Sequence, residues 1–109
     1  MEYRTVYITT ADQDEARRIG RELVNARLAA CANIVPAIES IYRWQGEIHD
    51  DSETLLVAKT TQPQMEKLIE KVKQLHSYEV PCITSWTIRE ANPDYLAWID
   101  EQTGQDASG

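Results

Sequence analysis

In the N-terminal third of the chain, apolar and polar residues first alternate, as in a strand, and apolar residues then recur at intervals of three and four, as in a helix. Residues 3–10 are rich in β-branched and aromatic types, and Val6 and Ile8 would share one face of a strand. Asp12, followed three places on by Glu15, is typical of a helix N-terminus. Beyond it the pattern predicts an amphipathic helix whose stripe comprises Ala16, Ile19, Gly20, Leu23, Val24 and Arg27.

The middle of the chain predicts two long strands joined by a tight turn. Residues 28–34 form an almost continuous apolar run, an extended pattern resumes over 37–44, and residues 54–60 form the returning strand. Gly46 favours a hairpin tip because glycine tolerates positive φ. Strands of this length are expected to project beyond the helices. Pro36 predicts a bend or bulge, since proline cannot donate to a ladder.

The C-terminal half predicts a helix, a strand and a shorter helix. Thr61 fits the N-cap of the first helix, whose apolar stripe comprises Met65, Leu68, Ile69, Val72 and Leu75. Residues 80–88 form the predicted strand, which contains Cys82. Asn92 then caps a short helix with the apolar residues Tyr95, Leu96, Trp98 and Ile99. Residues 103–109 are polar, and we expect a disordered tail there.

This order of elements is β-α-β-β-α-β with a terminal helix, the ferredoxin-like arrangement of the α+β class. It predicts a single domain over residues 1–102, with one antiparallel sheet and two helices on one face. The other face would carry tyrosine, threonine, tryptophan and aliphatic side chains, which are too apolar to stay wet. We therefore expect partner subunits to cover it, with Trp86 and Trp98 as core or interface anchors.

Length and charge exclude several classes of partner. The 109 residues suit one compact domain, and the net charge is −7. No basic stripe forms along the first helix, because acidic residues interrupt its arginines: Asp14, Glu15, Arg17, Arg18, Arg21 and Glu22. Nucleic acid and anionic membranes are therefore not expected as partners.

The chain shows no targeting segment and no catalytic motif. No basic segment followed by an apolar run opens it, and no apolar stretch reaches transmembrane length. We expect a cytoplasmic protein whose two cysteines, Cys31 and Cys82, stay reduced. There is no GxGxxG, Walker loop or GxSxG, and neither His49 nor His76 sits in a recognisable catalytic motif. We therefore expect no enzyme activity and no required cofactor.

Five segments of the chain resemble the CutA family of divalent-cation tolerance proteins. They are residues 28–34 (LAACANI), 40–46 (SIYRWQG), 59–61 (KTT), 76–81 (HSYEVP) and 95–99 (YLAWI). The resemblance implies a ferredoxin-like protomer in a compact trimer, similar to PII signalling trimers, in which long hairpins pair across subunits. It also implies a link to tolerance of divalent metals, copper above all. After Tyr-Glu-x-Pro the family usually has a glutamate, whereas this chain has Cys82, a soft thiol that would suit copper or zinc.

Each candidate metal ligand in this sequence also has a purely structural interpretation. Cys31 and Cys82 could be thiolate ligands, or they could pack as small hydrophobes. A structural zinc site needs four clustered ligands, and no CxxC or HxxxH is present, so a site shared between subunits stays open. A further group near the hairpin is either a solvated turn or a cluster of hard ligands; it comprises His49, Asp50, Asp51 and Glu53.

A second group of residues predicts a polar pocket at a subunit boundary. His76, Tyr78 and Glu79 follow the second helix, and Lys59 and Trp44 could complete the pocket. Cationic, aromatic and carboxylate groups together would suit a small anionic or zwitterionic ligand. The alternative is that His76 caps the helix and Tyr78 packs.

These features predict a trimeric divalent-cation tolerance protein that binds copper, another metal ion or a small ligand at its subunit interfaces. The alternative function is a PII-like signalling or structural trimer that binds a protein partner without direct metal chemistry.

Overall fold

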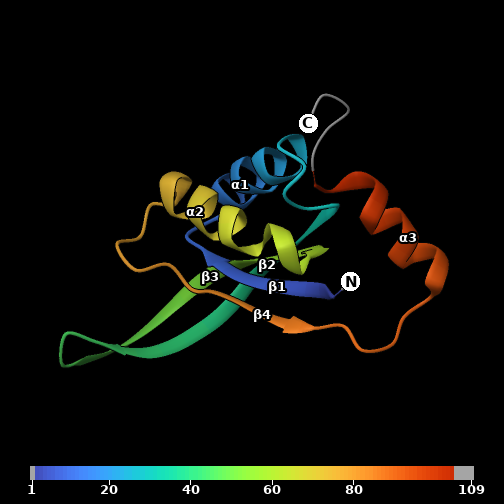
Figure 1. Ribbon diagram of the computed structural model, residues 1–109. Helices are drawn as coiled ribbons and strands as arrows, with labels where there is room; N and C mark the ends of the chain where they lie inside the picture. Colours follow the sequence, from blue (N-terminus) through green and yellow to red (C-terminus); the bar gives the residue numbers. More distant parts are fainter. Residues whose placement is uncertain (1, 105–109) are drawn as a thin grey trace.

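The computed structural model describes residues 2–104 and has the predicted ferredoxin-like order (Figure 1). Its four-stranded antiparallel sheet has the strand order β2-β3-β1-β4. The elements are β1 (Tyr3–Thr10), α1 (Gln13–Asn25), β2 (Cys31–Trp44), β3 (Glu47–Thr61), a 3-10 turn (Gln62–Gln64), α2 (Met65–Leu75), β4 (Ile83–Thr87) and α3 (Pro93–Gln102). No helix among these residues is long and apolar enough to span a membrane.

Helix α1 begins where the sequence predicts and ends earlier. Asp12 is extended, and its carboxylate accepts a hydrogen bond from the Glu15 N–H at 2.8 Å, which is an N-cap. The predicted stripe ran on to Arg27, but the helix stops at Asn25. Arg27 has a φ of 60°, and this left-handed residue turns the chain toward β2.

The core lies between the sheet and the two helices α1 and α2, which Figure 1 shows together on one side of the sheet. The strands supply Val6, Ile8, Leu56 and Ala58, each fully buried. Gly20 lets α1 approach the sheet closely, because a Cβ at this position would lie 3.2 Å from Ala32 Cβ and 3.4 Å from Leu56 Cδ1.

Strands β2 and β3 extend past the helices as a hairpin arm, residues 38–53 (Figure 1). The ladder steps from the pair Val35↔Leu55 to the pair Ile38↔Glu53, so β2 carries one extra residue at the predicted bulge beside Pro36. The extra residue reverses the alternation of faces along β2 beyond that point. The acidic segment 47–53 is part of β3, and Gly46 forms the predicted tip with a φ of 83°.

Two C-terminal predictions differ from the structure. Strand β4 is shorter than residues 80–88, because its ladder with β1 starts at Ile83; Cys82 therefore precedes the strand. Thr103 and Gly104 were expected in a disordered tail. The Thr103 hydroxyl instead donates to the Ile99 carbonyl oxygen at 2.8 Å, and the Gly104 N–H donates to the Arg27 carbonyl oxygen at 3.0 Å. The rest of the predicted tail lies outside the described residues.

The second face of the sheet has little cover within this chain. Among the described residues, helix α3 covers one end of this face, where the Tyr3 hydroxyl donates to Asp100 and Cys31 Sγ lies 3.4 Å from the Tyr95 hydroxyl. Further along, Trp86 is 52% exposed beside Tyr7, and Val35 is 44% exposed. Trp98 is 38% exposed on α3. The two tryptophans that the sequence assigned to a core or an interface are therefore not core residues of the protomer.

The close approach at Gly20 yields a stability prediction. The Gly20→Val variant is expected to lower the free energy of unfolding by about 1–3 kcal/mol, because the added side chain meets Ala32 and Leu56. Helix propensity alone favours valine over glycine and predicts the opposite sign. Equilibrium urea denaturation at one fixed protein concentration measures the change.

The matched control is Arg21→Val, the next residue on α1, which is exposed. It should change the free energy of unfolding by only about 0.5 kcal/mol. Equal effects of the two valines would show that the contact at Gly20 does not limit the packing.

Candidate functional site

A cavity of about 560 Å³ opens where the hairpin arm leaves the body of the protein. We call it the hairpin-base cavity. Its walls come from the end of β1, the arm, and the segment between α2 and β4. The lining residues are Thr9, Ala11, Ser40, Tyr42, Trp44, Asp51, Glu53, Tyr78, Glu79, Val80 and Cys82.

The cavity lies on the sheet face that α1 and α2 leave open. Thr9 pairs with Leu55 on this face. Glu53 and Asp51 precede Leu55 at alternate positions of β3, so they share its face. Because of the bulge, Ser40 stands opposite Asp51 on the same face. The cavity therefore continues the open face of the sheet.

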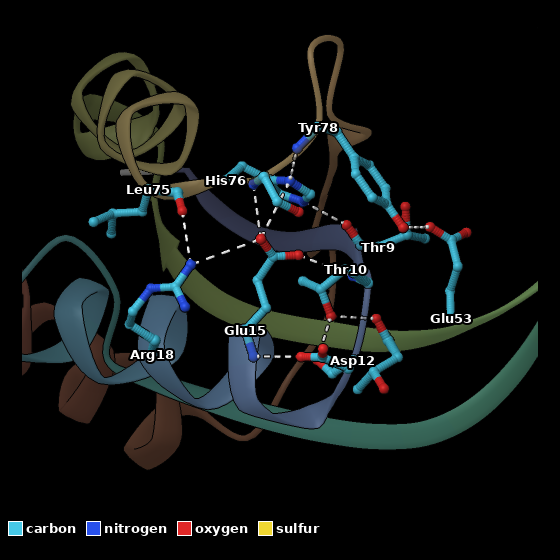
Figure 2. Close-up of polar contacts among 12 residues, drawn as sticks. Thr9, Thr10, Asp12, Glu15, Arg18, Glu53, Leu75, His76 and Tyr78 are labelled. Atoms are coloured by element: carbon cyan, nitrogen blue, oxygen red, sulfur yellow. Dashed lines mark hydrogen bonds and ion pairs between the residues drawn. The ribbon is translucent and has the colours of Figure 1, made fainter.

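His76 fixes the segment that forms one wall of the cavity (Figure 2). Its side chain is fully buried, and its Nδ1 accepts a hydrogen bond from the Tyr78 N–H at 3.1 Å. Nε2 therefore carries the proton and donates to the Thr9 carbonyl oxygen at 2.8 Å. His76 does not line the cavity, but it ties the chain before Tyr78 to the end of β1.

Glu15 supports the same segment from below (Figure 2). Its carboxylate is 5% exposed and accepts hydrogen bonds from the Ala11 N–H at 2.9 Å and the Ser77 N–H at 2.7 Å. Arg18 lies 3.7 Å and His76 3.9 Å from Oε2. Burial by itself would raise the pKa of Glu15, but the hydrogen bonds from Ala11 and Ser77 outweigh it, and the pKa is lowered.

Two tyrosines orient two carboxylates at the cavity. The Tyr78 hydroxyl donates to Glu53 Oε2 at 2.6 Å, and the Tyr42 hydroxyl donates to Asp51. Burial first, and then the hydrogen bond to Glu53, raises the pKa of Tyr78 well above its ordinary value. The hydrogen bond to Asp51 raises the pKa of Tyr42. Both hydroxyls therefore stay protonated at neutral pH and act as donors.

The structure brings together only part of the predicted pocket. Trp44, Tyr78 and Glu79 line the cavity, and so does Cys82. Lys59 does not, because it stands six positions along β3 from Glu53, about 20 Å for an extended strand.

Cys31 is separated from Cys82 in the same way. It pairs with Lys59 at the far end of the sheet, and its Sγ lies 3.4 Å from the Tyr95 hydroxyl. This hydrogen bond, with burial, raises the pKa of Tyr95 to about 12. Among residues 2–104, no group of three or more His, Cys, Asp or Glu side chains is placed to hold a metal ion.

Two residues of the site escape the sequence reasoning. Tyr42 was not proposed for the pocket, and Glu15 was predicted only as part of a helix cap. Strand alternation would have identified Tyr42, because it stands two positions before Trp44 on β2 and therefore shares its face. The contact of Glu15 with Ser77 spans 62 positions and leaves no local pattern. Of the acidic group near the hairpin, Asp51 and Glu53 reach the cavity, whereas His49 stacks on Tyr42.

Comparison with known proteins gives one consistent result. A family model described as "CutA1 divalent ion tolerance protein" matches residues 4–102. The chain is 52% identical over 99 residues to the divalent-cation tolerance protein CutA of Thermus thermophilus, covering 91% of this chain and 96% of that protein. It is 40% identical over 98 residues to the chloroplastic protein CutA of Arabidopsis thaliana, covering 90% of this chain and 54% of that protein.

Solved structures agree with the sequence matches. The Thermus thermophilus divalent cation tolerance protein (Cut A1) superposes with a TM-score of 0.91 at 51% identity, covering 94% of this chain and 99% of that one. CutA1 from Oryza sativa gives a TM-score of 0.93 at 36% identity, covering 97% of each chain. The periplasmic divalent cation tolerance protein CutA of Archaeoglobus fulgidus gives 0.89 at 37% identity, covering 92% of this chain and 97% of that one.

The lowered pKa of Glu15 yields a pH-dependence prediction. The pKa of Glu15 in the folded protein lies below the ordinary value of 4.5, so between these two pKa values the unfolded chain binds more protons than the folded one. The stability that the Glu15 carboxylate contributes is therefore present above pH 4.5 and is lost as the pH falls from 4.5 through the folded pKa. At neutral pH, Glu15→Gln should cost about 1–3 kcal/mol, because an amide donor then faces a backbone N–H. The difference in the free energy of unfolding between the variant and the wild type should become smaller below pH 4.5.

Urea denaturation at a series of pH values measures this gap. The control is Glu22→Gln on the same helix, whose side chain makes no hydrogen bond within the described residues. A gap that stays constant across the acid range would mean that the Glu15 carboxylate is not the titrating group.

Proposed function

The chain belongs to the CutA1 divalent ion tolerance family, and we propose that it works as a homotrimer that binds copper, another divalent cation or a small ligand at the hairpin-base cavity. In this proposal the cavity lies between subunits, the protein is cytoplasmic and not an enzyme, and it needs no resident cofactor. Nucleic acid and membranes are not among its partners.

The open sheet face supports assembly. Trp86, which is 52% exposed, and Val35, which is 44% exposed, stand on the face of the sheet that α1 and α2 do not cover. The hairpin arm also carries Ile41 and Ile48 at 69% and 67% exposure, on its other side. Exposed apolar surface of this extent is typical of a protein interface. Two or more such surfaces per chain suit a closed ring of three copies.

The observation that carries the ligand proposal is the charge of the hairpin-base cavity. Asp51, Glu53 and Glu79 line it together with the Cys82 thiol. No lysine, arginine or histidine lines it among the described residues. With Lys59 about 20 Å away, the anionic or zwitterionic ligand that the sequence suggested meets no cationic side chain among the described residues that line the cavity. The cavity instead favours a cation.

A metal ion in this cavity would need donors from more than one protomer. Copper and zinc prefer thiolate and imidazole donors, and the single thiol of the cavity is Cys82. The described part of one protomer gathers fewer than three donors around a point. Because the cavity continues the open face, a second subunit is the natural source of the others.

The alternative function is a signalling or structural trimer that binds a protein partner. The exposed Ile41 and Ile48 on the arm favour it, since an apolar pair on an extended hairpin can dock a partner strand. A pull-down that compares the wild type with a variant carrying Ile41→Ser and Ile48→Ser separates the two functions. Metal-binding activity that survives these substitutions supports the cavity.

Copper titration distinguishes the two cysteines. Isothermal calorimetry on the full chain is expected to show saturable heat with copper, weaker binding of zinc and the weakest of magnesium. Cys82→Ser should weaken copper binding by about tenfold, whereas Cys31→Ser, which alters the thiol at the far end of the sheet, should leave it unchanged. Absence of copper heat above the buffer control, or loss of binding only in Cys31→Ser, would contradict the cavity as a metal site.

Assembly can be tested on the open face. Sedimentation equilibrium of the wild type should give the mass of three chains. Trp86→Asp places a carboxylate on the surface that is buried in the proposed trimer and should shift the population toward smaller species. Gln74→Asp adds the same charge on the exposed side of α2 and should leave the trimer intact. A wild type that sediments as a single chain refutes the proposed assembly.

A further inference from the structure

The walls of the hairpin-base cavity combine three aromatic rings with three carboxylates, and we infer that its preferred ligand is an organic ammonium ion. The rings belong to Tyr42, Trp44 and Tyr78. In this assignment the nitrogen of the ligand meets the carboxylates and its carbon skeleton packs on the rings. The inference rests on the proposed function in one respect, since it takes this cavity as the binding site.

The size of the cavity favours a molecule over a bare ion. Its volume is about 560 Å³, within the range of small-molecule sites. Donor atoms surround a metal ion at about 2.0–2.6 Å, which requires side chains to converge on one point. The described residues show no such convergence of three donors, because the acidic side chains are spread over the arm and the segment before β4.

Glu53 gives the most specific indication of a cation with N–H donors. The residue is 8% exposed overall, and it lines the cavity. Tyr78 donates to Oε2, whereas Oε1 accepts no hydrogen bond from residues 2–104 (Figure 2). Oε1 therefore has its lone pairs free to accept a charged N–H donor from a ligand, a hydrogen bond stronger than one between neutral groups.

The aromatic rings favour the same class of ligand. Trp44 and Tyr42 are 40% and 42% exposed, so both have ring surface free for contact. Their neighbouring carboxylates make the cavity negative, and a cation over an aromatic face is attracted by the ring quadrupole. Tyr42 and Tyr78 donate their hydroxyls to Asp51 and Glu53, which fixes both the rings and the acceptors before a ligand arrives.

A set of ligands with one carbon skeleton tests the assignment on the full wild-type chain. The probes are phenethylammonium, phenethyl alcohol and 3-phenylpropionate, which are cationic, neutral and anionic. We expect phenethylammonium to bind with a dissociation constant of about 1 mM or tighter and at least about tenfold more tightly than the other two, as measured by amide NMR shifts. Equal binding of the three, or tighter binding of the propionate, overturns the inference, and so does the absence of saturable shifts with the ammonium.

Two variants locate the binding. Glu53→Gln keeps the shape and an acceptor for Tyr78, and it should weaken phenethylammonium by about tenfold while leaving the alcohol unchanged. Glu66→Gln removes an exposed carboxylate on α2, outside the cavity, and should change neither ligand. Equal weakening by both variants, or none by Glu53→Gln, overturns the assignment.

Copper titration of the same samples separates this inference from the proposed function. Copper binding that depends on Cys82, with no binding of phenethylammonium, overturns the ammonium assignment and leaves the cation site standing. The absence of both copper and ammonium binding overturns both proposals.

Discussion

The carboxylate of Glu15 is the contact on which the arrangement of this protein depends. It stands in the first turn of α1 and accepts backbone N–H groups from Ala11, before the helix, and from Ser77, after α2. Both hydrogen bonds are partly buried, so each amide finds its partner in this carboxylate at a place with reduced access to water. The position is also favourable for a negative charge, because the N-terminus of a helix carries a partial positive charge. One side chain thus ties the end of β1, the start of α1 and the exit of α2 into one unit.

The effect of this contact reaches the cavity through a continuous set of hydrogen bonds. His76 lies against Glu15, donates a hydrogen bond to the Thr9 carbonyl oxygen at the end of β1, and accepts a hydrogen bond from the Tyr78 N–H. Tyr78 in turn donates to Glu53 on β3. The carboxylate of Glu53, whose Oε1 accepts no hydrogen bond from the described residues, is therefore positioned by a hydrogen-bond network that starts at the buried Glu15. A ring held at both its backbone and its hydroxyl loses little freedom when a ligand binds, which favours affinity.

Features that depend on neighbours in the chain can be predicted from this sequence. The cap at Asp12 and the bulge beside Pro36 are of this kind, because side-chain chemistry and a missing N–H act locally. The face that Trp44 occupies cannot be inferred from alternation alone, since the extra residue of the bulge reverses the parity of β2. Lys59 was predicted beside the pocket, but it stands six positions along β3 from Glu53, about 20 Å away, because both residues belong to one extended strand. The contact between Glu15 and Ser77 joins residues far apart in sequence, which periodicity does not report.

In the proposed trimer, ligand binding and assembly would be physically linked. Two rings of the hairpin-base cavity, Tyr42 and Trp44, stand on the arm, which α1 and α2 do not support. The other side of the arm exposes Ile41 and Ile48, so the position of the arm in the proposed trimer would be determined by what packs on these two residues. A ligand that needs the arm in one position then binds more tightly to the assembled protein, and by reciprocity it stabilises the assembly by the same free energy. In the proposed trimer, a small molecule in the cavity between subunits would therefore act on the quaternary structure directly.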